Sequence, residues 1–302
     1  MQDFYRAMSN NGCIFIGAGI SNLIGFPLWK SFAGSILEFA WQRRSTFQYR
    51  SFDVSEKEEL ADMIQRDKLI DVITFCKDIF KENNCMDDYY QYIESVFDDQ
   101  EKYKSTSNAA FAALHKLSQQ LFFLQTNIDY SLEIYFTKIN KAPTCIFINR
   151  NLPPEIEAVP AGAIIYLHGK VTQRDTIIFT TDEYNDFYEK QASLREFLVK
   201  LFTEKSVLFL GYSLSDKEVL QTIAKSNTSK THYLSLANKR RDEVKNKLFS
   251  AILINHYNIK TIEYDVEAGY EEIISFINDI CNEIYKVPVT LVMPLDDRSM
   301  AK

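Results

Sequence analysis

The chain alternates short apolar runs with segments of helical periodicity over most of its length. We predict strands at 13–16, 121–125, 144–148, 163–167, 207–210, 232–236 and 259–263. Helical patterns fill the gaps around 190–204, 215–225, 239–255 and 269–286. This alternation is typical of βαβ units. It predicts the α/β class, with a doubly wound, mostly parallel, Rossmann-like sheet.

One stretch departs from the alternation, because residues 31–118 contain no convincing strand. Apolar positions within 55–80 recur every three to four residues, as on one face of a helix. They are Leu60, Met63, Ile64, Ile70, Ile73 and Phe80. A crossover between parallel strands needs only about a dozen residues, so this stretch predicts a helical subdomain inserted into the sheet domain. The subdomain could close a ligand cleft, or it could be a helical layer without a part in binding.

These patterns divide the chain into three parts. Residues 1–30 and 119–286 are predicted to form the sheet domain, 31–118 the inserted helical subdomain, and 287–302 a C-terminal tail. The tail contains two prolines and ends in polar residues. An edge strand, an oligomer contact and a frayed end are all compatible with its sequence.

Composition limits the classes of function. The formal net charge of -7 and the pI near 5.3 offer no general attraction to nucleic acid, so direct nucleic-acid binding is not expected. No run reaches the ~20 apolar residues of a membrane helix, and the N-terminus has no export-signal pattern. We therefore expect a cytoplasmic protein without membrane association. The five cysteines are scattered and none forms a C-x-x-C pair, which predicts no metal site.

A glycine-containing turn follows the first predicted strand. The sequence Gly17-Ala18-Gly19-Ile20-Ser21 places glycines where a dinucleotide site needs a tight turn and backbone N–H groups close to a pyrophosphate. It departs from G-x-G-x-x-G, since Asn22 stands at the third glycine. No second strand with an acidic ribose ligand follows about twenty residues on. An ordinary nicotinamide-dependent dehydrogenase is therefore disfavoured.

Polar groups also follow three later strands, at the edge where open α/β sheets bind ligands. They stand in the segments Gln125-Thr126-Asn127-Ile128-Asp129, His168-Gly169 and Gly211-Tyr212-Ser213, the last followed by Asp216. Any one of them could be structural, and Asp129 and Asp216 are good helix N-caps. Four such strand ends on one sheet favour a shared ligand site.

Taken in order, the motifs GAGIS, GFP, TNID, LHG and GYS resemble the sirtuin-like NAD-binding fold over roughly 10–30 and 120–285. The block LSLAN, ending at Asn238, is similar to a later strand end of that family. The four-cysteine zinc module of protein-deacylating sirtuins is not matched, and Leu28-Trp29-Lys30 replaces the family's Asp-Phe-Arg. Thr126 also departs from the family's Gln-Asn-Ile-Asp. These traits resemble the divergent bacterial sirtuin-like NADases of antiphage defence.

The resemblance implies an NAD glycohydrolase that releases nicotinamide and leaves ADP-ribose or a cyclised relative. NAD would be the substrate, and no metal would be needed. Catalysis would rest on Asn127, His168 and Asp129, with His168 as a general base whose pKa is near its ordinary ~6.5. The implied dinucleotide-binding residues are Gly17, Ala18, Gly19, Ser21, Thr126, Gly211, Tyr212, Ser213 and Asn238.

The same resemblance implies partners and leaves alternatives open. A defence effector must stay silent until infection, so we expect a homo-oligomer controlled by an ATPase or helicase-like protein or by a phage-derived trigger. One alternative function is an NAD-dependent protein deacylase, which would require a peptide groove. Another is a sensor that binds NAD or an ADP-ribose derivative without chemistry.

Overall fold

A computed structural model describes residues 1–104, 109–139, 141–214, 216–226, 228–238, 242–266 and 272–286. The predicted tail at 287–302 lies outside these residues. Seven strands form one sheet, and each overlaps a run predicted from the sequence. They are β1 (Gly12–Ile16), β2 (Phe123–Gln125), β3 (Ile146–Ile148), β4 (Ile164–Tyr166), β5 (Ser206–Leu210), β6 (His232–Asn238) and β7 (Ile259–Asp265).

The sheet is parallel throughout, and its strand order is β3-β4-β2-β1-β5-β6-β7. Strand β1 therefore lies at the centre, between β2 and β5. The chain builds one half of the sheet after β1 and then crosses to the other side at β5. Ligands of open α/β sheets bind at the carboxyl edge beside such a change of direction. The topology confirms the predicted doubly wound, Rossmann-like fold.

Alternate side chains of the strands enter two separate hydrophobic cores. Ile14 and Ile16 of β1 pack into one core, whereas Cys13 and Phe15 pack into the other. Successive strand residues point to opposite faces of a sheet, so a strand buried on both faces must be apolar at nearly every position. This is why the strands appear in the sequence as continuous apolar runs.

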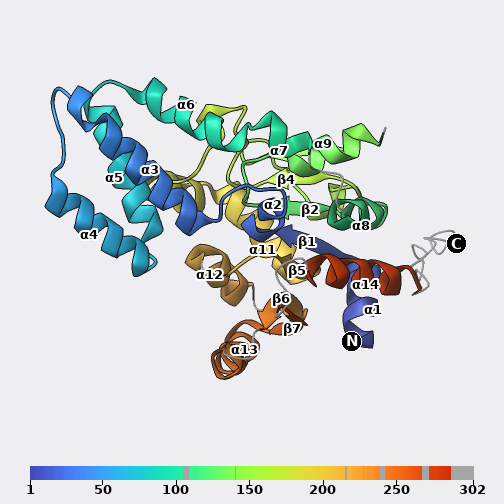
Figure 1. Cartoon of the computed structure of the whole chain (residues 1–302). Helices are drawn as coiled ribbons and strands as arrows, with labels where there is room; N and C mark the ends of the chain where they lie inside the picture. Colours follow the sequence, from blue (N-terminus) through green and yellow to red (C-terminus); the bar gives the residue numbers. More distant parts are fainter. Residues whose placement is uncertain are drawn as a thin grey trace, which may run out of the picture.

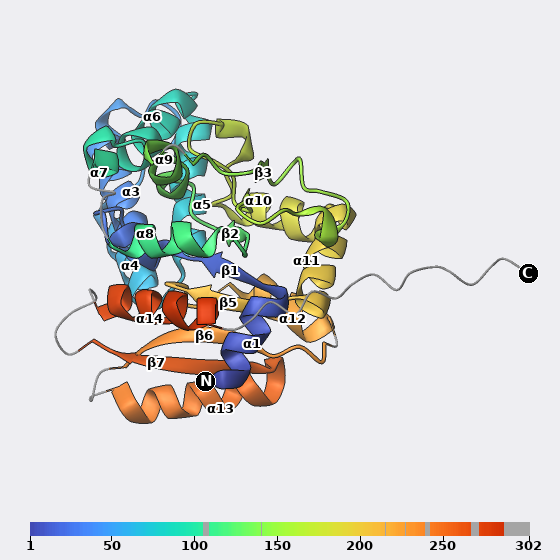
Figure 2. The same cartoon turned by 90° about the vertical axis from the view of Figure 1, so that its right-hand side faces the viewer.

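Helices cover both faces of the sheet (Figure 1). The core containing Ile14 is closed by α1 (Gln2–Asn11), α8 (Ala109–Leu117) and α14 (Glu272–Lys286). The core containing Phe15 is closed by α11 (Ala192–Glu204), α12 (Lys217–Lys225) and α13 (Glu243–Tyr257). In Figure 2, α13 lies below β7 and α14 lies above it. No described helix is both long and apolar enough to cross a membrane.

Only helices lie between β1 and β2 in the described part of the chain. After the short α2 (Ala18–Asn22) come α3 (Trp29–Arg43), η1 (Arg44–Thr46), α4 (Val54–Gln65), α5 (Leu69–Glu82), α6 (Met86–Phe97), α7 (Gln100–Lys104) and α8. Figure 1 shows α3–α6 together at one end of the molecule, beyond the end of β1 that leads into α2. Helix α8 instead packs against α14 in the layer that covers the sheet. The division at 31–118 stays a prediction.

Polar contacts join the helices of the insertion to the segment that follows β4. This segment contains η3 (Arg174–Thr176), α10 (Thr181–Asn185) and the π-helix η4 (Asp186–Lys190). Arg174 pairs with Glu94 of α6 (Nε–Oε1 2.6 Å), and Lys77 of α5 pairs with Glu183 of α10. Exposed ion pairs contribute little free energy each, and these two mark where the helices between β1 and β2 contact the segment after β4. Two further short elements are α9 (Ser131–Lys138) and η2 (Ile156–Ala158).

His232, the first residue of β6, is a fully buried titratable group. Its Nδ1 atom accepts a long hydrogen bond from the N–H of Val207 (3.4 Å), and its ring packs edge-on against Phe202. The Nε2 atom has no partner among the described residues. Burial lowers the pKa of His232 to about 4, so the ring stays neutral in the folded protein.

Acidification should destabilise the fold through His232. The unfolded side chain takes up a proton near pH ~6.5, whereas the folded ring resists protonation until about pH 4. This stability is present above the unfolded pKa and falls by roughly 2–3 kcal/mol as the pH drops toward the folded pKa. In His232→Leu, the free energy of unfolding measured with urea should fall less steeply between neutral pH and pH ~4.5. Equal pH slopes for the variant and the wild type would contradict this account.

Candidate active site

The turns after β1 and β5 are in direct backbone contact. The N–H of Gly19 donates to the carbonyl of Gly211 (2.9 Å), and the N–H of Gly17 donates to the carbonyl of Leu210 (3.0 Å). A Cβ atom on Gly17 would lie 2.5 Å from the Gly211 carbonyl oxygen, and Gly211 itself has a φ of 61°. Side chains therefore cannot be accommodated where the two turns meet. The glycines predicted from the sequence are explained here by this contact between the two turns.

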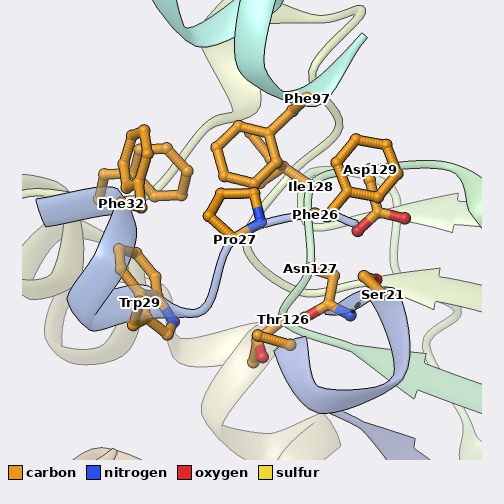
Figure 3. A pocket seen from close by; sticks show the side chains of 12 residues that line it. Ser21, Phe26, Pro27, Trp29, Phe32, Phe97, Thr126, Asn127, Ile128 and Asp129 are labelled. Atoms are coloured by element: carbon orange, nitrogen blue, oxygen red, sulfur yellow. Dashed lines mark hydrogen bonds between the residues drawn. The ribbon is translucent and has the colours of Figure 1, made fainter. Parts of the chain in front are cut away.

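The amide of Asn127 is held by the same turn. Its Nδ2 atom donates to the Gly17 carbonyl (3.0 Å) and to the hydroxyl of Ser21 (2.8 Å), and Figure 3 shows the side chains of Asn127 and Ser21 pointing toward each other. Because a carbonyl can only accept, the nitrogen must face Gly17, and this fixes the orientation of the amide. No donor in the described part of the chain contacts Oδ1. That oxygen can accept a hydrogen bond from a ligand.

A pocket lies beside Asn127 at the carboxyl edge of the sheet (Figure 3). Its empty space is about 360 Å³ when the open mouth is included. The lining residues come from the β1 and β2 loops, the insertion and the segment after β4. They are Ala18, Ser21, Phe26, Pro27, Trp29, Phe32, Phe97, Thr126, Asn127, Ile128, Asp129 and Phe179. The structure thus brings five predicted residues together: Ala18, Ser21, Thr126, Asn127 and Asp129.

Aromatic side chains form one wall of this pocket. The ring of Phe32 lies 5.0 Å from that of Phe97 and 5.1 Å from that of Phe179, and Trp29 lies 5.0 Å from Phe179. Phe97 is the last residue of α6, so a helix between β1 and β2 supplies part of the wall. The sequence motifs give no signal for Phe97 or Phe179. Phe26 could have been found, because the motif Gly25-Phe26-Pro27 was part of the resemblance.

Asp129 is a buried carboxylate in the same pocket, 2% exposed. It accepts hydrogen bonds from the backbone N–H (3.1 Å) and the hydroxyl of Ser131, the first residue of α9. Burial raises the pKa of Asp129, and the hydrogen bonds from Ser131 and Ser21 partly oppose this rise. The side chain therefore presents a buried acidic group to the pocket.

His168, the third predicted catalytic residue, does not line this pocket. It follows β4 and is 1% exposed, with its ring enclosed by Tyr184, Phe187 and Tyr188. Its Nε2 atom lies 2.9 Å from the Tyr188 hydroxyl, and its Nδ1 atom lies 3.4 Å from the Tyr184 hydroxyl. Burial lowers the pKa of His168 to about 3. The ordinary pKa near 6.5 expected from the sequence is therefore wrong, because a desolvated ring resists the charge.

The remaining predicted binding residues follow β5 and β6. Tyr212 packs against Phe15 and Phe209, and its buried hydroxyl has no hydrogen-bond partner among the described residues. Ser213 follows it and is exposed. Asn238, at the end of β6, donates to Glu263 (2.7 Å) and accepts from Asn246 (3.3 Å). None of these side chains lines the pocket at Asn127.

Within the described residues no three His, Cys, Asp or Glu side chains are grouped as metal ligands. All five cysteines are free, and Cys13, Cys76 and Cys281 are buried. Burial raises the pKa of the Cys13 and Cys76 thiols, so both stay protonated.

Comparison with known proteins finds similarity over the part of the chain that contains β2 to β7. Residues 121–262, from the start of the β2 run into β7, match the SIR2-like domain. The chain is 23% identical over 225 residues to an NAD(+) hydrolase ThsA of Cytobacillus dafuensis, covering 72% of this chain and 39% of that protein. It is 24% identical over 305 residues to an NAD(+) hydrolase ThsA of Bacillus cereus (strain MSX-D12), covering 94% of this chain and 57% of that protein.

The chain thus spans about half the length of the curated relatives it matches. The matched domain includes the TNID, LHG and GYS motifs, and the glycine turn after β1 lies outside it. The match agrees with the parallel sheet and with the motif order along the chain. Residues 121–262 are therefore similar to the SIR2-like domain, and the chain resembles the divergent, NAD-hydrolysing members of the sirtuin-like group.

Proposed function

We propose that the protein hydrolyses NAD at the bond between nicotinamide and ribose. The observation that carries this proposal is the pocket in which an aromatic wall faces the fixed amide of Asn127 and the carboxyl group of Asp129. Two relatives named NAD(+) hydrolase support it. Because the chain covers about half of each relative, the activity of the whole relative is transferred here only as a proposal.

The nicotinamide ring would occupy the pocket. A flat, positively charged pyridinium suits a wall of aromatic faces, which attract cations through their quadrupoles. The free Oδ1 of Asn127 would accept a hydrogen bond from the carboxamide of the ring, or would orient the attacking water. Asp129 would stabilise positive charge on the ribose as the bond breaks.

The reaction needs one water molecule and one base. The C1′–N bond of NAD breaks and its electron pair stays on the nicotinamide nitrogen, which becomes neutral. The water oxygen then bonds to C1′, and the proton it loses passes to His168. The products are nicotinamide and ADP-ribose, and attack by a hydroxyl of the substrate itself would give a cyclised relative.

In the conformation described here His168 is not reachable from the pocket, because Tyr184 and Tyr188 enclose it. Turnover therefore requires that the segment containing α10 and η4 moves. An enzyme that depletes NAD harms its own cell, so a resting state with a covered base suits an antiphage effector. We propose that assembly into a homo-oligomer, or contact with an ATPase-like partner or a phage-derived trigger, releases this segment.

A second candidate function is a sensor that binds NAD or an ADP-ribose derivative without cleaving it. The burial of His168 and its lowered pKa favour this alternative. Purified protein that binds NAD but releases no nicotinamide after long incubation at high concentration would support the sensor over the hydrolase.

Replacing His168 tests its role as the base. His168→Ala should fold and bind NAD, but lose ~10²–10⁴-fold in the rate of nicotinamide release. The rate is measured by chromatography of the products, and binding by calorimetry. An unchanged rate would remove His168 from the mechanism.

Replacing Asn127 tests the pocket itself. Asn127→Ala removes the free acceptor Oδ1 and should lower kcat/KM for NAD by roughly tenfold or more. Asn278→Ala is a matched control, because the amide of Asn278 in α14 also donates to a backbone carbonyl (that of Ile274, 3.0 Å) but does not line the pocket. Equal losses in the two variants would count against a specific role for Asn127.

A third test addresses the inserted helices. Phe97→Leu keeps an apolar side chain but removes one aromatic face, and should raise KM for NAD by roughly 3- to 10-fold with kcat little changed. Phe80→Leu, at an equally apolar site of α5 that does not line the pocket, should leave KM unchanged. If both variants keep the wild-type KM, the insertion has no part in binding.

A further inference from the structure

A line of hydrogen bonds runs from His168 to a carboxyl group that no motif places in catalysis. The Nε2 atom of His168 lies 2.9 Å from the hydroxyl of Tyr188, and that hydroxyl lies 3.4 Å from Oδ2 of Asp216. Oδ2 is also 3.7 Å from Nε2 directly. The three groups come from the end of β4, the π-helix η4 and the start of α12, so the fold brings together segments remote in sequence.

The network specifies one arrangement of protons. An ionised carboxylate can only accept, so the Tyr188 hydroxyl donates to Asp216 and its oxygen accepts from Nε2–H of His168. The Nδ1 atom is then the acceptor, and the Tyr184 hydroxyl stands 3.4 Å from it as a donor. Every proton in the group has a partner in this arrangement. The protein therefore selects the Nε2–H tautomer of the ring.

The two carboxyl oxygens of Asp216 contact different groups. Oδ1 caps α12 by accepting from the N–H groups of Glu218 (3.0 Å) and Val219 (3.4 Å). A cap requires one oxygen and no charge, and Asn caps a helix as well as Asp. Oδ2 faces Tyr188 and His168 instead. The cap by itself does not account for a negative charge buried at this position.

We propose that Asp216 is a positioning residue for His168, which orients the ring through Tyr188 and stabilises the imidazolium formed when His168 takes the proton of the attacking water. This inference rests on the proposed function. Its physical basis is that an imidazolium in a desolvated site is costly unless an anion lies close to it. The Asp216 carboxylate, 3.7 Å from Nε2, is that anion.

The titration of Asp216 gives a signature that a helix cap alone would lack. Burial, and then the charge of Glu218, raise the pKa of Asp216 to about 6, while its hydrogen bonds oppose the rise. The other groups facing it are His168, Tyr184, Tyr188 and Tyr212, and burial keeps the pKa of each tyrosine well above the usual value. Below pH ~6 the Asp216 carboxyl group becomes neutral and no longer stabilises the charge of the imidazolium. Activity should therefore fall through this pH range.

The test is Asp216→Asn, which keeps a capping oxygen and removes the charge. We expect kcat for nicotinamide release to fall ~10²-fold or more, with KM for NAD changed less than about threefold. The acidic limb of the wild-type pH profile, centred near pH 6, should be absent from the variant. Asp53→Asn makes the same change at the N-cap of α4 in the insertion and should leave rate and pH profile unchanged.

A second variant and a second measurement separate the possible failures. Tyr188→Phe keeps Asp216 and the aromatic packing but removes the hydroxyl that connects His168 to Asp216. It should reproduce most of the loss in kcat. Nitrogen chemical shifts of the His168 ring report the tautomer without any need for turnover, and the Nε2–H form of the wild type should be lost in Asp216→Asn. Wild-type rate, pH profile and tautomer in Asp216→Asn would overturn the inference. An unaffected His168→Ala would remove His168 from the mechanism, whereas wild-type protein that binds NAD but releases no nicotinamide would overturn the proposed function.

Discussion

The contact between the turns after β1 and β5 is the constraint on which the site depends. The strand order places β1 and β5 side by side, and the hydrogen bond from Gly19 to Gly211 draws their turns together. The Gly17 carbonyl then holds the amide of Asn127, which arrives from β2 on the other side of β1. Three strand ends are thus joined by backbone hydrogen bonds and by the side-chain amide of Asn127. A side chain at either glycine would force these strand ends apart.

The helices between β1 and β2 also contribute to the site. Phe97 closes the pocket from α6, and the pair between Arg174 and Glu94 ties that helix to the segment after β4. The pair between Lys77 and Glu183 does the same for α5 and α10. These two pairs connect the helices between β1 and β2 to the segment that carries Tyr184 and Tyr188 over His168.

The site consists of two compartments. Asn127 and Asp129 face an open, partly aromatic pocket, whereas His168 and Asp216 lie in a closed polar cluster. The segment after β4 produces this separation, because Tyr184 of α10 and Phe187 and Tyr188 of η4 pack around the His168 ring. Chemistry that uses both compartments requires a rearrangement of the tyrosines between them.

The sequence by itself determined the strands, the parallel fold, the glycine turn and the polar strand ends. It could do so because strands buried on both faces must be apolar runs, and because the ends of parallel strands must meet at one edge. The tertiary structure decided that Asn127 and Asp129 share a pocket with Phe97, and that His168 is covered. It also decided that Asp216 faces His168 through Tyr188. These relations depend on side-chain directions and on packing between remote segments, and neither leaves a periodic signal in the chain.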